Sequence, residues 1–300
     1  MLRVFLGALV AATLLSAETY HVYYLGGQSN MDGYGKVSEL SADLRGVNNA
    51  VPIFHGNPKP DGEAGGGLGV WAKLRPGHGA GFSADSTANK YSNRFGIEVT
   101  FVRRMNELRP GEKIALIKYS RGGTSIDETA ARWFGSWEAD FVGGPQQYSG
   151  VNQYDNFLST LKNAFAERDI DGDGASDILI PAGILWMQGE SDAATAAVAG
   201  RYEGNLKRLM DLMRAALRVD DLPVVIGRIS DSGEDKDGKV WNYGDVVRQA
   251  QQDFVDSDTA AAIVTETDKY GYSDPYHYDS NGYIELGKRF AEALHSIRPE

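Results

Sequence analysis

Five short apolar runs, separated by stretches with helical spacing, constrain the fold of this chain more than any other feature. The runs are nearly continuous in apolar residues, as expected of parallel strands that are buried on both faces. Parallel strands joined through helices need right-handed crossovers, which place helices on both faces of one sheet. The pattern therefore predicts an α/β fold, a three-layer αβα sandwich with a five-stranded parallel sheet. The expected strands are Tyr20–Leu25, Ile114–Tyr119, Ile178–Met187, Pro223–Ile229 and Ala261–Thr265.

The segment from residue 32 to about residue 90 differs from the rest of the chain. It is rich in Gly, Pro, Asn and Asp and shows little periodicity, so we expect a long surface loop inserted into the fold. Its place after the first strand suggests that it walls one side of a cleft, and the alternative is an insertion without a role. The expected helices are Arg94–Leu108, Gln153–Glu167, Ala193–Leu217, Tyr243–Val255 and Asn281–Ile297.

The N-terminal segment has the pattern of a secretory signal. Arg3 supplies an early positive charge, and the apolar stretch over residues 4–16 is too short to span a bilayer well. We therefore expect residues 1–17 to be a signal peptide and residues 18–300 to form a single domain. The predicted location is secreted or periplasmic, and no other segment is apolar for long enough to cross a membrane.

Charge and cysteine content narrow the possible partners. The formal net charge of −11 argues against nucleic acid and anionic membranes, and it is compatible with a neutral substrate such as a sugar. The chain has no cysteine, which excludes disulfides and thiol chemistry.

Four polar blocks lie at or beyond the carboxyl ends of expected strands. Ligands of open α/β folds bind at that edge of the sheet, so the four blocks are expected to converge. Together they contain a hydroxyl, an imidazole, carboxylates and glycines, which are the groups that acyl transfer needs. The blocks are Gly27-Gln28-Ser29-Asn30-Met31, Ser120-Arg121-Gly122-Gly123-Thr124-Ser125, Trp186-Met187-Gln188-Gly189-Glu190-Ser191-Asp192 and Asp274-Pro275-Tyr276-His277.

Within these blocks, the residue types suggest a catalytic triad. Ser29 is the expected nucleophile, His277 the base and Asp274 the carboxylate that orients the imidazole. Glu190 is an alternative orienting carboxylate, and otherwise it is expected to support the site through backbone or substrate contacts. Without the other blocks, Ser29 would be interpreted as an ordinary turn residue.

The expected oxyanion hole has three donors. They are the backbone N–H groups of Ser29 and Gly122 and the side-chain amide of Gln188. Glycine suits a position where the backbone must approach a substrate closely.

In this order, the four blocks resemble those of the SGNH/GDSL hydrolase superfamily. More narrowly, they are similar to the sialate O-acetylesterase-like domain and to the acetylxylan esterases of carbohydrate esterase family 6. The resemblance covers essentially the whole chain after the signal segment. It implies a flavodoxin-like fold and a serine esterase that removes O-acetyl groups from a carbohydrate without a cofactor. The superfamily usually has asparagine in the third block, whereas Gln188 stands here, as in the carbohydrate-esterase subgroup.

Two other functions remain open on the same fold. One is a lipase or thioesterase of the GDSL type, and the other is a carbohydrate-binding protein without catalysis. The second is disfavoured because a binding module does not need Ser29, Asp274 and His277 together. The sequence does not distinguish xylan, sialic acid, pectin and sulfated glycans as substrates.

A separate acidic loop resembles the first part of a calcium-binding loop. Asp169, Asp171, Asp173 and Asp177 stand at positions 1, 3, 5 and 9, with glycine at position 6. The bidentate glutamate of position 12 is replaced by Ile180. A structural calcium site is one expectation, and an acidic turn between a helix and the next strand is the other.

Overall fold

The computed structural model of the chain describes residues 17–61, 63–131, 134–143 and 150–298. Its central layer over these residues is a seven-stranded sheet in the order β11-β10-β9-β1-β8-β3-β4. Neighbouring strands run parallel except β4, which pairs antiparallel with β3 at one edge. The strands are β1 (Thr19–Gly27), β3 (Asn48–His55), β4 (Ala72–Leu74), β8 (Ile114–Ser120), β9 (Ile178–Met187), β10 (Val224–Gly227) and β11 (Ala261–Val264).

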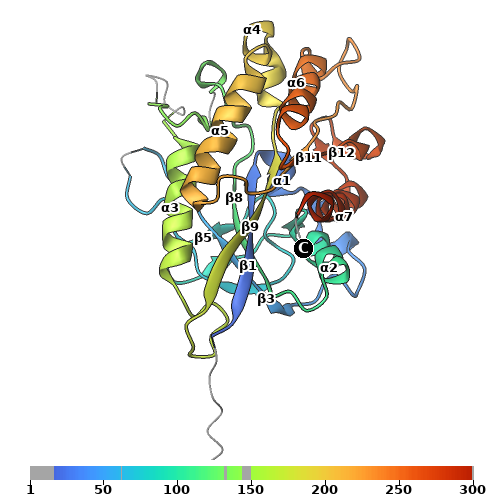
Figure 1. Cartoon of the computed structure of the whole chain (residues 1–300). Coiled ribbons are helices and arrows are strands. Elements are labelled where there is room, and N and C mark those ends of the chain that lie inside the picture. Colours follow the sequence, from blue (N-terminus) through green and yellow to red (C-terminus); the bar gives the residue numbers. More distant parts are fainter. Residues whose placement is uncertain (1–16, 62, 132–133, 144–149, 299–300) are drawn as a thin grey trace, which may run out of the picture.

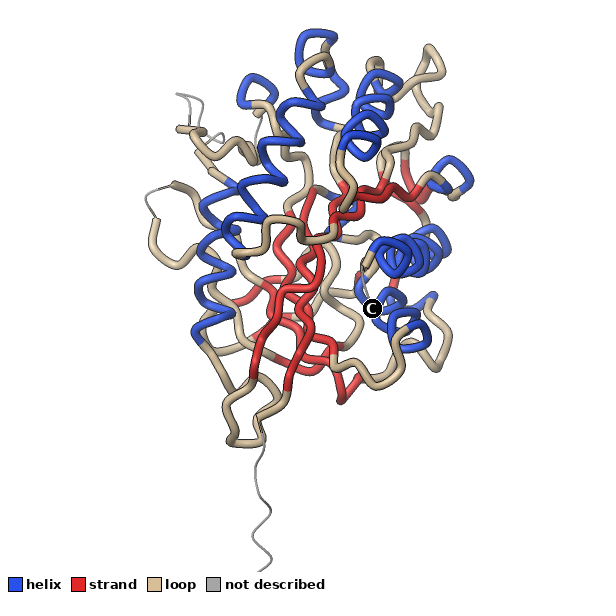
Figure 2. Tube along the Cα trace, viewed as in Figure 1, coloured by secondary structure: helices blue, strands red, loops and turns tan. Residues whose placement is uncertain are grey.

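Helices cover both faces of this sheet and complete the expected three layers (Figures 1 and 2). Helices α2 and α7 pack together on one face, whereas α3 and α5 cover the other, with α6 against α5. Their bounds are α2 (Glu98–Leu108), α3 (Gln153–Ala166), α5 (Tyr202–Leu217), α6 (Gly244–Ser257) and α7 (Ser280–Ile297). Among the described residues, no helix combines the length and the apolar character that a membrane crossing requires.

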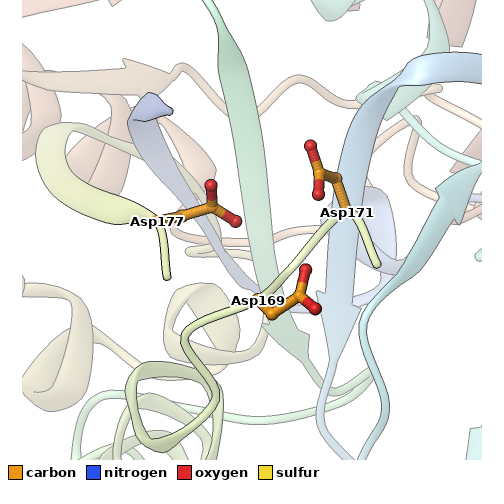
Figure 3. A group of neighbouring side chains, drawn as sticks. All are labelled: Asp169, Asp171 and Asp177. Carbon is orange, nitrogen blue, oxygen red and sulfur yellow. The ribbon is translucent and has the colours of Figure 1, made fainter. Parts of the chain in front are cut away.

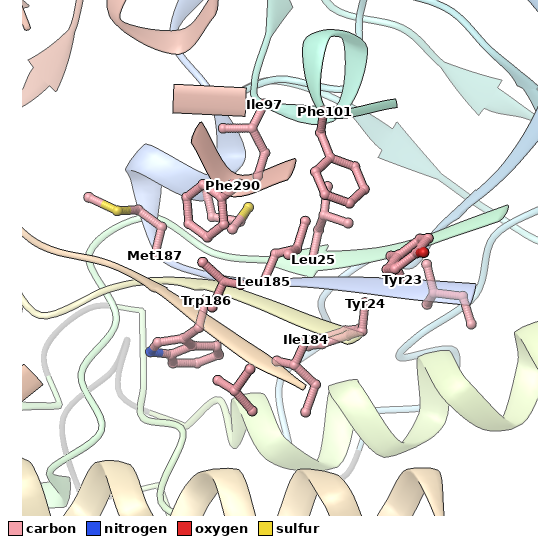
Figure 4. Packing of buried hydrophobic residues seen from close by; sticks show 14 of the residues in the cluster. Tyr23, Tyr24, Leu25, Ile97, Phe101, Ile184, Leu185, Trp186, Met187 and Phe290 are labelled. Carbon is pink, nitrogen blue, oxygen red and sulfur yellow. The ribbon is translucent and has the colours of Figure 1, made fainter. Parts of the chain in front are cut away.

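The core lies on both sides of β1, the central strand. Successive side chains of a strand point to opposite faces, so Tyr23 packs edge-on against Phe101 of α2 and Tyr24 against Phe157 of α3. The same alternation along β9 sends Trp186 and its neighbours to opposite faces (Figure 4). This explains why the strands read as continuous apolar runs rather than as alternating patterns.

The segment between residues 32 and 90 is more structured than expected. It supplies β3 and β4 to the main sheet, so the expectation of five strands is corrected to seven. Pro52 hides β3 in the sequence because proline cannot donate to a ladder. The structure tolerates it beside a register shift in the pairing with β4, and only Ile53–His55 pair with β8.

Shorter elements lie within this segment or directly before it, where α1 ends at Asp32. They are α1 (Ser29–Asp32), β2 (Gly35–Lys36), η1 (Val37–Glu39), β5 (Ser83–Ala84) and β6 (Asn89–Lys90), and β2 pairs with β7 (Arg94–Phe95) just beyond the segment. Because Arg94–Phe95 forms a strand, the helix expected from Arg94 begins only at Glu98.

The helix expected over Ala193–Leu217 is broken into η3 (Ser191–Ala194), α4 (Ala196–Ala199) and α5. Thr195 has extended backbone and caps α4 by accepting a hydrogen bond from Val198 N–H, which ends the preceding turn. The signal peptide expected over residues 1–17 lies outside the described residues except for its last position.

Candidate active site

The turn after β1 places Ser29 at the carboxyl edge of the sheet. Gln28 N–H donates to Met187 O of β9 at 2.8 Å, and Arg121 N–H donates to Gly27 O at 3.0 Å, so the turn is held between both neighbouring strands. Gly27 has φ of 137°, and a Cβ there would lie 2.0 Å from the Met187 carbonyl oxygen. Only glycine fits this position. Helix α1 begins two residues later, at Ser29.

A small hairpin near the C-terminus, β12 (Tyr272–Asp274) and β13 (His277–Tyr278), brings His277 and Asp274 together. His277 Nδ1 lies 2.8 Å from Asp274 Oδ2, and Asp274 Oδ1 accepts the N–H groups of Tyr276 and His277 at 2.9 and 3.0 Å. Partial burial alone would raise the pKa of Asp274, but these hydrogen bonds hold it below its usual value. The carboxylate is therefore kept ionised beside the imidazole.

Asn30 connects the turn at Ser29 with this hairpin. Its Nδ2 donates to Tyr276 O at 3.2 Å, and its Oδ1 accepts Tyr278 N–H at 3.4 Å. These partners are the two sequence neighbours of His277, and α1 contacts β13. Segments almost 250 residues apart therefore meet beside Ser29, as the sequence blocks predicted.

Glu190 supports Asn30, whereas the hydrogen bond to the His277 ring comes from Asp274. Glu190 Oε1 accepts Asn30 Nδ2 at 2.8 Å, and Glu190 Oε2 is buried without a hydrogen-bond partner among the described residues. Burial raises the pKa of Glu190. Of the two carboxylates considered from the sequence, the geometry favours Asp274 as the one that orients the imidazole.

Gly122 packs directly against Ser29. A Cβ at Gly122 would lie 3.2 Å from Ser29 Cβ, so a larger residue would crowd the Ser29 side chain. Its N–H, an expected oxyanion donor, instead donates to Asp32 Oδ2 at 2.8 Å. Ser120 Oγ donates to Asp32 Oδ1 at 2.6 Å.

The side chain of Asp32 is partly buried, and this burial raises the pKa of its carboxyl group despite the two hydrogen bonds that it accepts. Asp32 is not among the site residues predicted from the sequence. The signal was present, because a charged residue follows Met31 in a turn that should be buried.

Gln188 is used differently from the expectation. Its Nε2 donates to Thr124 O at 3.1 Å and to Asp192 Oδ2 at 2.6 Å, and its Oε1 accepts the Tyr202 hydroxyl at 3.0 Å. Both amide hydrogens therefore have internal partners, and the side chain is fully buried. Burial also raises the pKa of Asp192 to about 7. The arrangement makes Gln188 a link between two loops and leaves it no spare N–H for a substrate oxygen.

Aromatic side chains surround His277. The Tyr34 ring is stacked on the imidazole, with centroids 3.6 Å apart and planes 4° from parallel. Tyr276 is 50% exposed, and the Trp241 ring lies 5.7 Å from it. Trp241 lines a cavity of about 300 Å³ with Ser232, whose hydroxyl donates to Pro275 O at 3.0 Å. Tyr34 thus brings the segment of residues 32–90 into contact with His277.

The acidic loop lies at the other end of the sheet. Oxygen atoms of Asp169, Asp171 and Asp177 lie within 4.8 Å of one another (Figure 3). Asp173 is outside this group, and its Oδ1 accepts Ala175 N–H at 2.7 Å. Because Asp177 directly precedes β9, a cation held by the three carboxylates would be far from the carboxyl edge and would have a structural role.

Comparisons with known proteins identify the family and support the fold. A family model described as carbohydrate esterase, sialic acid-specific acetylesterase, matches residues 19–296. No curated protein matches the chain. Similar solved structures include a protein of Arabidopsis thaliana, with 20% identity, a TM-score of 0.64 and coverage of 95% of this chain and 100% of that one.

Two further solved structures are similar to this chain over most of its length. A carbohydrate acetylesterase from Xanthomonas citri has 18% identity and a TM-score of 0.61, covering 93% of this chain and 56% of that one. NanS has 13% identity and a TM-score of 0.60, covering 94% of this chain and 98% of that one. At these identities the structures support the fold, a mostly parallel sheet between two layers of helices.

Proposed function

Because the chain belongs to the sialic acid-specific acetylesterase family of carbohydrate esterases and is a carboxylic ester hydrolase, we propose that it removes O-acetyl groups from a carbohydrate with Ser29 as nucleophile. One observation carries this proposal: Asn30, the residue after Ser29, is hydrogen-bonded to both neighbours of His277, whose ring is paired with Asp274. Hydroxyl, imidazole and carboxylate thus come from segments that the fold ties together.

The proposed reaction has two steps. Ser29 Oγ attacks the acetyl carbonyl carbon while His277 Nε2 takes the hydroxyl proton, and the imidazolium then protonates the departing sugar oxygen. Asp274 accepts the Nδ1–H, which selects the tautomer and stabilises the imidazolium. In the second step His277 activates water, which releases acetate and restores Ser29. No cofactor is needed for this chemistry.

The oxyanion that forms in each step requires donors near Ser29. We assign the N–H groups of Ser29 and Gly122, since Gly122 packs against Ser29. The Gly122 N–H must turn from the Asp32 carboxylate to the substrate oxygen for this purpose, because Asp32 holds it in the free protein. Gln188 is not included, because its side chain is fully buried and donates both amide hydrogens to internal partners, whereas Gly122 packs directly against Ser29.

A carbohydrate is the substrate class that the surroundings favour over a lipid. Half-exposed Tyr276 and its neighbour Trp241 offer ring faces beside His277, and such faces stack against sugars. The cavity next to Trp241 is lined mainly by polar and charged side chains, which suits hydroxyl-rich ligands. A lipase would require an apolar groove at this place.

Two further proposals concern the protein outside its catalytic site. We propose that the chain is exported, since residues 1–17 have the pattern of a signal peptide. We also propose that Asp169, Asp171 and Asp177 hold a structural calcium ion, because three carboxylates gathered in one loop repel one another without a cation.

Replacement of the nucleophile tests the proposed reaction. We expect Ser29→Ala to abolish hydrolysis of 4-nitrophenyl acetate and release of acetate from a panel of acetylated glycans, with unchanged far-UV circular dichroism. Ser86→Ala, in an exposed loop, is the matched control and should retain full activity. Acetate release by Ser29→Ala at the wild-type rate would end the proposal, and the panel identifies the glycan.

A further inference from the structure

Three charged or aromatic side chains form a stack that ends on the catalytic imidazole. His277 covers one face of the Tyr34 ring at a centroid distance of 3.6 Å, and the Arg94 guanidinium carbon lies over the same ring at 4.5 Å. Since the imidazole lies parallel to Tyr34 and fills one face, Arg94 must cover the other. The order of the stack is therefore Arg94, Tyr34, His277.

Short backbone pairings hold Tyr34 and Arg94 in the positions that this stack requires. Strands β2 and β7 pair antiparallel, with Lys36 opposite Arg94, so that Tyr34 and Arg94 are diagonal neighbours on one face. Gly33, just before Tyr34, has φ of 97°, and a Cβ there would lie 2.2 Å from Gly96 Cα. This close approach fixes the position from which the Tyr34 ring projects.

From this geometry we propose that Tyr34 is a positioning residue for His277 in the esterase reaction, a role that rests on the proposed function. The hydrogen bond to Asp274 restrains Nδ1, but coupled changes in the χ1 and χ2 torsions of His277 can still tilt the ring plane while Nδ1 stays near the carboxylate oxygen. A coplanar ring 3.6 Å away removes that tilt. Tyr34 thereby fixes the direction in which Nε2 faces the serine hydroxyl.

The stack also acts on the charge that His277 gains during each step. The face of an aromatic ring attracts a cation, so Tyr34 stabilises the imidazolium, and Arg94 on the far face opposes this effect. Asp274 favours the imidazolium directly, while Asp32 and Arg121 act on Tyr34 with opposite signs. Burial, followed by the charge of Asp32, raises the pKa of Tyr34, so the stacking ring stays neutral.

Paired substitutions separate the ring from its hydroxyl. We expect Tyr34→Leu to lower kcat by about tenfold to 100-fold with little change in KM, because misorientation of a catalytic group has effects of this order. Tyr34→Phe keeps the stack and should restore most of the lost kcat. Both variants are compared by thermal unfolding to verify the fold.

The titration of the His277 ring, followed by NMR, provides a readout independent of turnover. Loss of the aromatic face in Tyr34→Leu should lower the midpoint relative to Tyr34→Phe, whereas Arg94→Gln, which removes the opposing charge, should raise it. The acidic limb of kcat/KM should move in the same directions. Equal kcat values and equal titration midpoints in Tyr34→Leu and Tyr34→Phe would overturn the inference.

Failure of the proposed function gives a different result. If the wild-type protein releases no acetate from any ester, the reaction is wrong, while the NMR midpoints still decide whether Tyr34 controls the imidazole. If Tyr34→Leu does not fold, the Arg94→Gln variant tests the inference instead. An unchanged midpoint of the His277 titration in that variant would contradict the proposed role of the stack.

Discussion

The acidic loop and the candidate active site are assembled from the chain in different ways. The acidic loop gathers Asp169, Asp171 and Asp177 from nine consecutive positions directly before β9. The candidate active site, at the other end of the sheet, joins α1 to a hairpin near the C-terminus through Asn30. The first arrangement depends on local chain geometry, and the second exists only when the whole sheet is formed. Substitutions in the two regions should therefore differ in what they affect.

The largest expected effect is in the long-range site. Asp274→Asn should lower kcat by about 10⁴-fold, because a neutral amide neither selects the tautomer nor stabilises the imidazolium. Glu190→Gln is the matched control, since Glu190 contacts Asn30 rather than the imidazole, and it should lose much less activity. Steady-state kinetics on 4-nitrophenyl acetate measure both. A greater loss in Glu190→Gln would reverse the assignment of the two carboxylates.

A smaller change is expected at Asp32, the partly buried carboxylate that accepts the Gly122 N–H. Asp32→Asn keeps an oxygen for the Gly122 N–H but removes a negative charge beside the developing oxyanion, so kcat should rise by roughly three- to tenfold. Because burial raises the pKa of Asp32, the gain should be greatest at high pH, where the wild-type carboxyl is ionised. Asp85→Asn, on an exposed loop, controls for overall charge. A tenfold loss instead would mean that the charge of Asp32 is needed to hold the loop.

The smallest effect on catalysis is expected for the acidic loop, where a bound cation should instead change the stability of the fold. Calcium at about 100 times its Kd should stabilise the fold by about 2.7 kcal/mol and raise Tm by several degrees, with kcat unchanged. Asp169→Asn should abolish this shift, whereas Asp173→Asn, outside the carboxylate group, should retain most of it. Differential scanning calorimetry with calcium or chelator measures the shift. An equal Tm in both conditions would exclude the cation.

The features of the fold and site that the sequence predicted depend on long strands and on residues close together in one hairpin. The strands that precede Ser29, Gly122 and Gln188 were predictable because each is a buried apolar run, and the carboxyl ends of parallel strands meet at one edge. The family match confirms the resemblance to the sialate O-acetylesterase-like domain, and the observed fold agrees with it. The hydrogen bond between Asp274 and His277 follows from their spacing within one hairpin.

What escaped prediction depends on short or irregular pairings. Tyr34 reaches His277 only because two-residue strands, β2 and β7, pair across a gap of more than 50 residues, and strands of this length leave no periodic signal. Strand β3 was hidden by Pro52. The orientation of Gln188 was not accessible either, since it depends on where Asp192 lies in the folded loop.

The hydrogen bonds of Asn30 have a consequence for the order of events in biosynthesis. A ribosome makes this chain from its N-terminus, so the serine segment emerges first and the hairpin with the imidazole almost last. If these residues act as proposed, we expect the nascent polypeptide to be inert toward esters until its final portion docks onto the β-sheet, and a product that terminates before residue 272 to remain inactive.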